Sequence, residues 1–158
     1  MKKKTRQLLI LNGLLILIVA AAILSVNSGY ARIPFSTAVG SIFQPHMDGA
    51  SVVVAQFRVP RIVLAVLCGM GLALAGCVMQ TVTGNPLADP GIAPHMARRL
   101  IGGRHHALMP ASMLLGALLL LLADTLGRSA FQPREIPVGI VISVLSAPYF
   151  LFLLRRYF

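Results

Sequence analysis

Three of the four histidines lie close to arginines, and they are the first side chains to consider for chemistry. His95 precedes a pair of arginines, and His105 and His106 follow another arginine directly. A metal site needs three or four converging donors, and no carboxylate or thiol stands near these histidines. The sequence therefore predicts no metal site and no cofactor.

The remaining reactive side chains form no catalytic arrangement. There is no nucleophile with a base and an orienting group, and no glycine-rich phosphate loop with a lysine. Cys68 and Cys77 lie in one apolar run, and in a helix they would be roughly 13 Å apart along the axis, too far to form a disulfide. We expect both to act as small packing residues. The sequence does not predict an enzyme, and energy for any active process would come from a separate nucleotide-binding protein.

A basic segment at residues 93–107 has the composition of a short helix with defined ends. Pro94 stands near its start and Gly102 follows its last apolar residue, the order in which these two residues flank helices. Arg98 and Arg99 are suited to pair with carboxylates of a partner protein. They are also suited to contact lipid headgroups, and the residues alone leave both roles open. The candidate residues for coupling the membrane helices to such a partner protein are Pro94, His95, Arg98, Arg99, Gly102 and Gly103.

The composition indicates that the segments around these residues lie in a membrane. Hydrophobic residues make up 57% of the 158 residues and charged residues only 11%, against about 25% in a typical soluble domain. The net charge of +10 lies at the chain ends and between apolar runs, without the aromatic-interleaved stripe of a nucleic-acid-binding surface. We therefore expect the chain to lie in a lipid membrane and not to bind nucleic acid.

Four apolar runs are candidates for membrane-spanning helices. The first begins after a basic leader, so a secretory signal peptide is the alternative, but its apolar stretch exceeds the usual ~7–15 residues. The expected fold is all-α, a polytopic membrane protein with about four transmembrane helices and a single membrane domain over residues 1–158. The four runs are Leu8–Val26, Ile62–Thr83, Ala107–Ala123 and Ile136–Leu154.

The second run is rich in small residues at four-residue spacing. In lipid, small residues at this period let neighbouring helix backbones approach closely. We expect this helix to be packed against others, or to line a passage, and the sequence leaves open which. The candidate residues for this packing or pathway wall are Gly69, Gly71, Ala73, Gly76 and Gln80.

The segments between the apolar runs contain helix-breaking prolines and one candidate ion pair. Pro34, Pro45 and Pro60 predict that residues 32–61 do not form a single long helix. Whether residues 51–55 are strand-like or interfacial stays open. Asp124 and Arg128 are spaced i,i+4 with the acid first, and we expect a modest interfacial ion pair.

The distribution of lysines and arginines along the chain favours one orientation of the helices in the membrane. With an inside N-terminus, nine lysines and arginines face the cytoplasm and five face the other side. Both termini are therefore expected in the cytoplasm.

Two ordered blocks of motifs resemble a known family. The first block has Arg58-Val59-Pro60-Arg61, a small-residue helix ending at Gln80, and a turn that runs to Gly91. The second has a P-H-x-x-R segment at Pro94–Arg98, Glu135-Ile136-Pro137-Val138-Gly139, and Ala147-Pro148-Tyr149-Phe150. Together they are similar to the permeases that import iron siderophores, haem and cobalamin. The residues of the family-motif turn are Asn85, Pro86, Leu87, Asp89 and Pro90.

The resemblance implies a function and a set of partners. It implies the permease subunit of an ABC importer for iron–siderophore complexes, in which the basic segment docks on an ABC ATP-binding subunit. Further partners would be a second permease subunit, in a homo- or heterodimer, and an extracytoplasmic siderophore-binding protein.

The chain departs from the family in length. Its members are roughly twice as long and have about ten membrane helices. Here an N-terminal part at residues 1–91 runs directly into a C-terminal part at residues 93–158, which predicts an internal deletion of an even number of crossings. The alternative is a truncated remnant that inserts in the membrane but does not transport.

Overall fold

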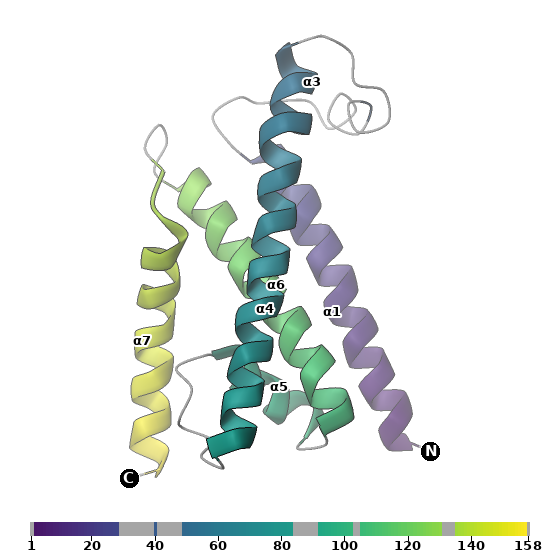
Figure 1. Ribbon diagram of the computed structural model, residues 1–158, viewed down its shortest axis with the longest axis vertical. Coiled ribbons are helices and arrows are strands. Elements are labelled where there is room, and N and C mark those ends of the chain that lie inside the picture. Colours follow the sequence, from purple (N-terminus) through teal and green to yellow (C-terminus); the bar gives the residue numbers. More distant parts are fainter. Residues whose placement is uncertain are drawn as a thin grey trace.

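The computed structural model describes residues 2–28, 40, 49–83, 92–102, 105–130 and 135–157. All regular structure in these residues is helical, so the prediction of an all-α fold is confirmed (Figure 1). The described elements are α1 (Lys2–Asn27), α3 (Gly49–Val53), the π-helical segment η1 (Val54–Arg58), α4 (Val59–Thr83), α5 (Ile92–Ile101), α6 (His105–Ser129) and α7 (Val138–Tyr157).

Three helices are long and apolar enough to cross a bilayer. They span Lys4–Asn27, Val54–Thr83 and His106–Ser129, with mean hydropathies of 2.8, 2.5 and 2.0. The prediction of a polytopic α-helical membrane protein is therefore confirmed. Helix α7 has 20 residues, of which Val138–Tyr149 form an apolar stretch, and the fourth crossing stays a prediction.

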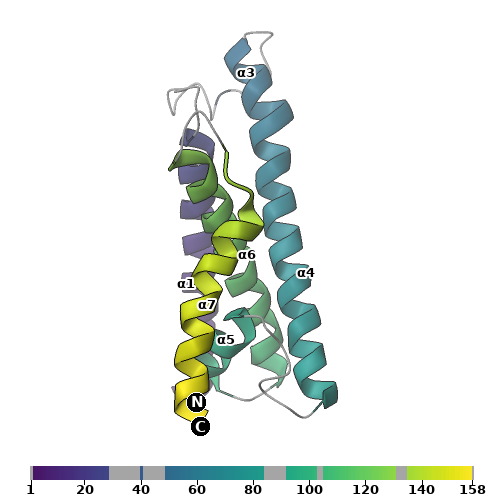
Figure 2. The same cartoon turned by 90° about the vertical axis from the view of Figure 1, so that its left-hand side faces the viewer.

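Pro60 is one of the three predicted breaks that keep residues 32–61 from forming a single long helix, and the prediction of a break at Pro60 is wrong. Residues 49–83 are helical without a break, and α3 continues in line with α4 (Figure 2). The N–H of Val59 donates to the carbonyl of Val54, five residues back, so a π-turn directly precedes the proline. A π-turn is one residue wider than an α-helical turn. The proline ring therefore does not clash with the carbonyl of the residue four positions earlier, as it would in a regular α-helix. Residues 51–55 are helical and therefore not a strand, while their location at the membrane interface stays a prediction. Pro34 and Pro45 lie outside the described residues.

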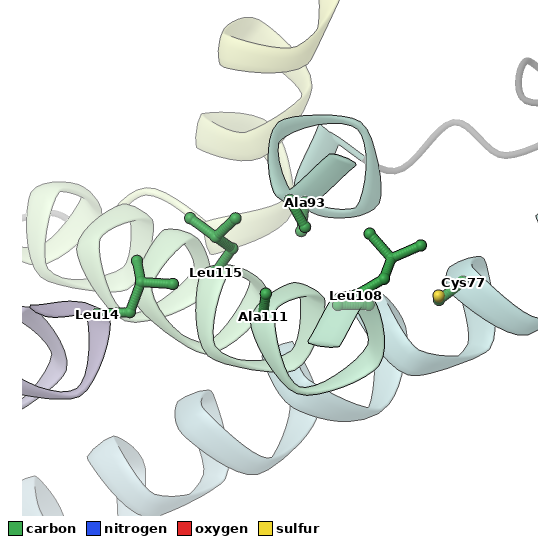
Figure 3. Packing of buried hydrophobic residues seen from close by; sticks show 8 residues of the cluster. Leu14, Cys77, Ala93, Leu108, Ala111 and Leu115 are labelled. Carbon is green, nitrogen blue, oxygen red and sulfur yellow. The ribbon is translucent and has the colours of Figure 1, made fainter. Parts of the chain in front are cut away.

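Helix α6 is the centre of the bundle. It contacts α1, α4, α5 and α7, and α4 packs along it most extensively. Leu108 and Leu121, both fully buried, anchor two core clusters at different heights of this helix. Figure 3 shows the first cluster, in which Leu14 of α1, Cys77 of α4 and Ala93 of α5 meet α6.

The two ends of the bundle differ in their charged residues. One end holds the start of α1, the end of α4, α5, the start of α6 and the end of α7 (Figure 1). We call it the basic end, because its described charged side chains are all cationic: Lys4, Arg6, Arg98, Arg99 and Arg155. The other end, here the paired end, carries both signs: Arg58, Arg61, Asp124, Arg128 and Glu135. A cytoplasmic location of the basic end stays a prediction.

Candidate coupling helix and charge network

The short helix predicted from the basic segment is present as α5. It begins at Ile92, so that Pro94 lies in its first turn, where a missing N–H breaks no helical hydrogen bond. It ends at Ile101, and Gly102 follows with φ +88°, a conformation that glycine adopts without steric strain. The N–H of Gly102 donates to the carbonyl of Arg98 at 2.9 Å and closes the last turn. Gly103 lies outside the described residues.

One face of α5 is held tightly against the bundle. Ala93, Pro94 and Ala97 are buried against α6 and the end of α4. Because two of these three residues are alanines, the backbone of α5 lies close to α6. The position of α5 is thus fixed by the same core that holds the membrane helices.

The other face of α5 carries its cations outward at the basic end. Arg99 is exposed, while His95 and Arg98 are half-buried. Arg6 of α1 donates a long hydrogen bond of 3.4 Å to the carbonyl of Leu100. The Nε of Arg98 is buried and has no hydrogen-bond partner among the described residues. The helix therefore offers a cationic surface on a rigidly packed base.

The small-residue face of α4 lies at the crossing with α6. Gly69 is buried against Gly116, and a Cβ at Gly69 would lie 2.8 Å from the Cα of Ala117. Ala73 and Gly76, on the same face, are also buried. Gly71 is exposed and has nothing within 4 Å of its Cβ position, because two residues along a helix turn it about 200° from Gly69.

Gln80 lies further along this face, towards the basic end. Its side chain is 2% exposed, and neither its amide oxygen nor its amide nitrogen has a partner in the described part of the chain. A role of this face in lining a passage stays a prediction. The family-motif turn, residues 85–90, lies outside the described residues.

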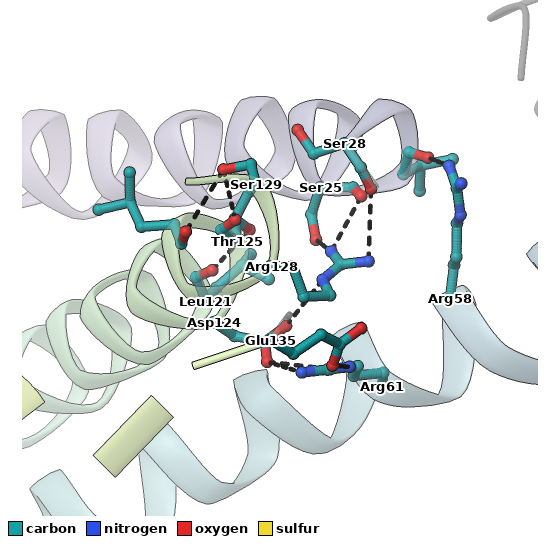
Figure 4. A network of polar contacts seen from close by, with 12 residues as sticks. Ser25, Ser28, Arg58, Arg61, Leu121, Asp124, Thr125, Arg128, Ser129 and Glu135 are labelled. Atoms are coloured by element: carbon teal, nitrogen blue, oxygen red, sulfur yellow. Dashed lines mark hydrogen bonds and ion pairs between the residues drawn. The ribbon is translucent and has the colours of Figure 1, made fainter. Parts of the chain in front are cut away.

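The paired end holds a network of charged side chains inside the bundle (Figure 4). Arg61 of α4 donates from Nε to Asp124 Oδ1 at 2.9 Å, and from Nη1 to Glu135 Oε2 at 2.7 Å. Its Nη2 lies 2.9 Å from the same Asp124 oxygen. One arginine thus joins α4 to α6 and to the segment before α7.

Arg128 connects the same network to α1. It donates from Nη2 to the carbonyl of Ser25 at 3.0 Å and to the hydroxyl of Ser25 at 2.6 Å. Its Nε lies 3.5 Å from Asp124 Oδ2. Arg58 also donates to α1, at the carbonyl of Val26. The last turn of α1 therefore receives hydrogen bonds from two different helices.

The predicted Asp124–Arg128 pair is present, but it is buried rather than exposed, and its position at the membrane interface stays a prediction. The two side chains are only 8% and 7% exposed. Arg61 covers the carboxylate, and α1 covers the guanidinium. The sequence reasoning missed Arg61 as a partner, although two arginines within an apolar helix are a recognisable signal of intramembrane pairing.

The charged groups of this network are suited to holding the helices together. They are guanidinium and carboxylate groups, which pair as fixed charges, although Asp124 Oδ2 and Arg128 Nε have no hydrogen-bond partner among the described residues. Across the described ranges, no group of three or more histidine, cysteine, aspartate or glutamate side chains could hold a metal ion.

The helical membrane bundle described above agrees with the sequence comparisons. The model of the FecCD transport family matches residues 15–93 and, separately, residues 92–156. The chain belongs to the FecCD transport family. The two matches of this FecCD chain meet where α5 begins, at the boundary between the two motif blocks.

Curated relatives of this FecCD chain are permease proteins of iron import systems. It is 62% identical over 65 residues to the iron(3+)-hydroxamate import system permease protein FhuG of Bacillus subtilis, covering 41% of this chain and 19% of that protein. It is 50% identical over 91 residues to the Fe(3+)-citrate import system permease protein YfmE of the same species, covering 57% of this chain and 27% of that protein.

A third relative aligns over more of the chain. The hemin transport system permease protein HmuU of Yersinia pestis is 37% identical over 113 residues, covering 72% of this chain and 31% of that protein. In these three comparisons the chain spans less than a third of the relative's length. No solved structure matches the chain.

Proposed function

We propose that the chain is a permease subunit of an ABC importer for iron–siderophore complexes, placed in the bacterial cytoplasmic membrane with its basic end in the cytoplasm. Family membership and the names of the iron-import relatives support this substrate class. ATP would be hydrolysed by a separate subunit.

The observation that carries the proposal is the geometry of α5. Its two alanines are packed against α6, and its cations lie at the basic end, with Arg99 exposed and Arg98 half-buried. A partner's carboxylates would bind the exposed Arg99 and the solvent-accessible part of the half-buried Arg98. Because α5 and α6 share one core, a displacement of the bound ATP-binding subunit would move the membrane helices as a rigid body.

The passage for the substrate would be completed by a second permease subunit. The cavity found among the described helices has a volume of about 270 Å³ and is mostly apolar. A cavity of about 150 Å³ holds one benzene ring, so this space is too small for an iron–siderophore complex. An extracytoplasmic siderophore-binding protein would deliver the complex at the paired end.

A second candidate is a remnant that inserts in the membrane but does not transport. The specific observation in its favour is that the two family matches abut at residues 92–93 while each relative is covered by less than a third. An internal deletion of the family's middle part accounts for both facts. This candidate keeps the fold and the family but loses the passage.

Reconstitution distinguishes the two candidates. The chain would be placed in proteoliposomes with the ATP-binding subunit and binding protein of the iron(3+)-hydroxamate import system, and ⁵⁵Fe-hydroxamate uptake would be measured with and without ATP. The proposed function predicts ATP-dependent uptake above that of liposomes containing the ATP-binding subunit alone. A stable complex without uptake would favour the remnant, and no complex would contradict both the docking role and transport.

A further inference from the structure

An apolar groove opens between α4 and α7 on one side of the bundle. Leu72 of α4 and Ile142 and Ser146 of α7 form its walls, and its volume is about 270 Å³. In the described residues α4 and α7 make no contact with each other, so the two walls are separate. Figure 2 shows α7 running beside the bundle, away from α4.

The floor of the groove lies at backbone level. Gly69 and Gly116 line it at the point where α4 and α6 cross. These two glycines are buried against each other, so α4 and α6 lie close together and the floor between the groove walls carries no side chain at these two positions. The groove therefore has the shape that receives side chains of a neighbouring helix, and its volume fits one or two large apolar side chains.

The groove also lies at the junction of the two family blocks. Ile92 and Ala93 line its end, and these are the residues at which the two family matches meet. In the longer relatives, the chain portion that is missing here would leave and re-enter the fold at this point. The position of the groove thus coincides with the position of the missing portion.

We propose that this groove is the seat of a transmembrane helix from the family's middle portion, supplied by another polypeptide. The inference rests on the internal deletion considered under the proposed function. The partner is an apolar, uncharged transmembrane helix with large side chains on one face, because the groove walls offer few polar groups and no charged side chain.

Co-purification tests the proposal. A tagged segment of the Bacillus subtilis permease protein YfmE, covering the stretch between its counterparts of residues 91 and 92, would be co-expressed with the chain and extracted in mild detergent. The unmodified chain should retain the segment, and Ser146→Leu, which fills the groove, should reduce the retained amount at least tenfold. Ser143→Leu is the matched control, because Ser143 is exposed on the same helix and does not line the groove. It should change retention less than twofold.

A second measurement guards against misfolding of Ser146→Leu. Ser146→Cys, in a background with Cys68→Ala and Cys77→Ala, adds a nearly isosteric thiol for labelling with a membrane-permeant maleimide. The labelling rate should fall at least fivefold when the segment is present, and an unrelated apolar transmembrane segment should not have this effect.

Three results would overturn the proposal. They are the absence of capture by the unmodified chain, equal loss in both serine-to-leucine variants, and protection of Ser146→Cys by lipid alone or by a second copy of the chain. A chain that fails here but transports iron in proteoliposomes would keep the proposed function and lose only this inference.

Discussion

Replacing Gly69 with alanine should separate the two most extensively packed helices of the bundle. A Cβ at Gly69 would lie 2.7 Å from the carbonyl carbon of Gly116 and 2.8 Å from the Cα of Ala117. Both neighbours are backbone atoms, so no side-chain rotation relieves the contact. The atom nearest to that Cβ is the carbonyl oxygen of Gly116, also in the backbone, so α6 has to move away by about 1 Å to reach the 3.4 Å of ordinary van der Waals contact.

The size of the effect follows from this displacement. Overpacking of a well-packed contact typically destabilises by about 1–3 kcal/mol. Alanine is also a better helix former than glycine by roughly 0.5–1 kcal/mol, which offsets part of the loss. We expect Gly69→Ala to lower the free energy of unfolding by about 1–2 kcal/mol, or roughly 5- to 30-fold in the unfolding equilibrium constant.

The matched control is Gly71→Ala, on the same helix. Nothing lies within 4 Å of its Cβ position, so only the gain in helix propensity remains, and the variant should be as stable as the parent or slightly more stable. Both variants would be unfolded in mixed micelles with increasing SDS and followed by circular dichroism. A difference between them below 0.5 kcal/mol would refute the assigned helix crossing.

Two further predictions concern buried polar groups and use the same unfolding assay. Asp124→Ala leaves the 7%-exposed Arg128 without its carboxylate, and should destabilise by about 3 kcal/mol, whereas Glu135→Gln, at a 56%-exposed side chain, should change stability by less than about 1 kcal/mol. Equal effects would mean that Asp124 is not the centre of the network. Gln80→Leu should leave stability unchanged or raise it by about 1 kcal/mol, because it removes two buried polar atoms that have no partner in the described chain. A marked loss of stability in that variant would show that the amide is paired.

The overall fold was largely predictable from composition and hydropathy. Apolar runs of membrane-spanning length dictate helices, because a lipid-exposed backbone has to satisfy its own hydrogen bonds. The short helix α5 was also predictable, since Pro94 and Gly102 mark its ends locally. The continuation through Pro60 was not, because a π-turn depends on the register of several residues rather than on the proline alone.

The candidate site was predictable only in part. The spacing of Asp124 and Arg128 showed that they could pair, but their burial depends on Arg61 and on the end of α1, which lie far away in the sequence. Similarly, four-residue spacing identified the small residues of α4, but not which of its two faces meets α6. Gly69 is in the contact and Gly71 is outside it. Such choices are made by tertiary packing, which one sequence does not reveal.

The central claim is that α5 docks an ATP-binding subunit, and co-purification of that subunit tests it most directly. The chain would be co-expressed with the ATP-binding subunit of the iron(3+)-hydroxamate import system and purified in detergent by a tag on the permease chain. We expect the parent to retain the subunit and the double variant Arg98→Glu with Arg99→Glu to lose it while still inserting in the membrane. The control, Lys4→Glu with Arg155→Glu, makes the same change in net charge at exposed positions of the same end and should retain it. If the α5 variant retains the subunit as well as the parent does, the docking role is contradicted.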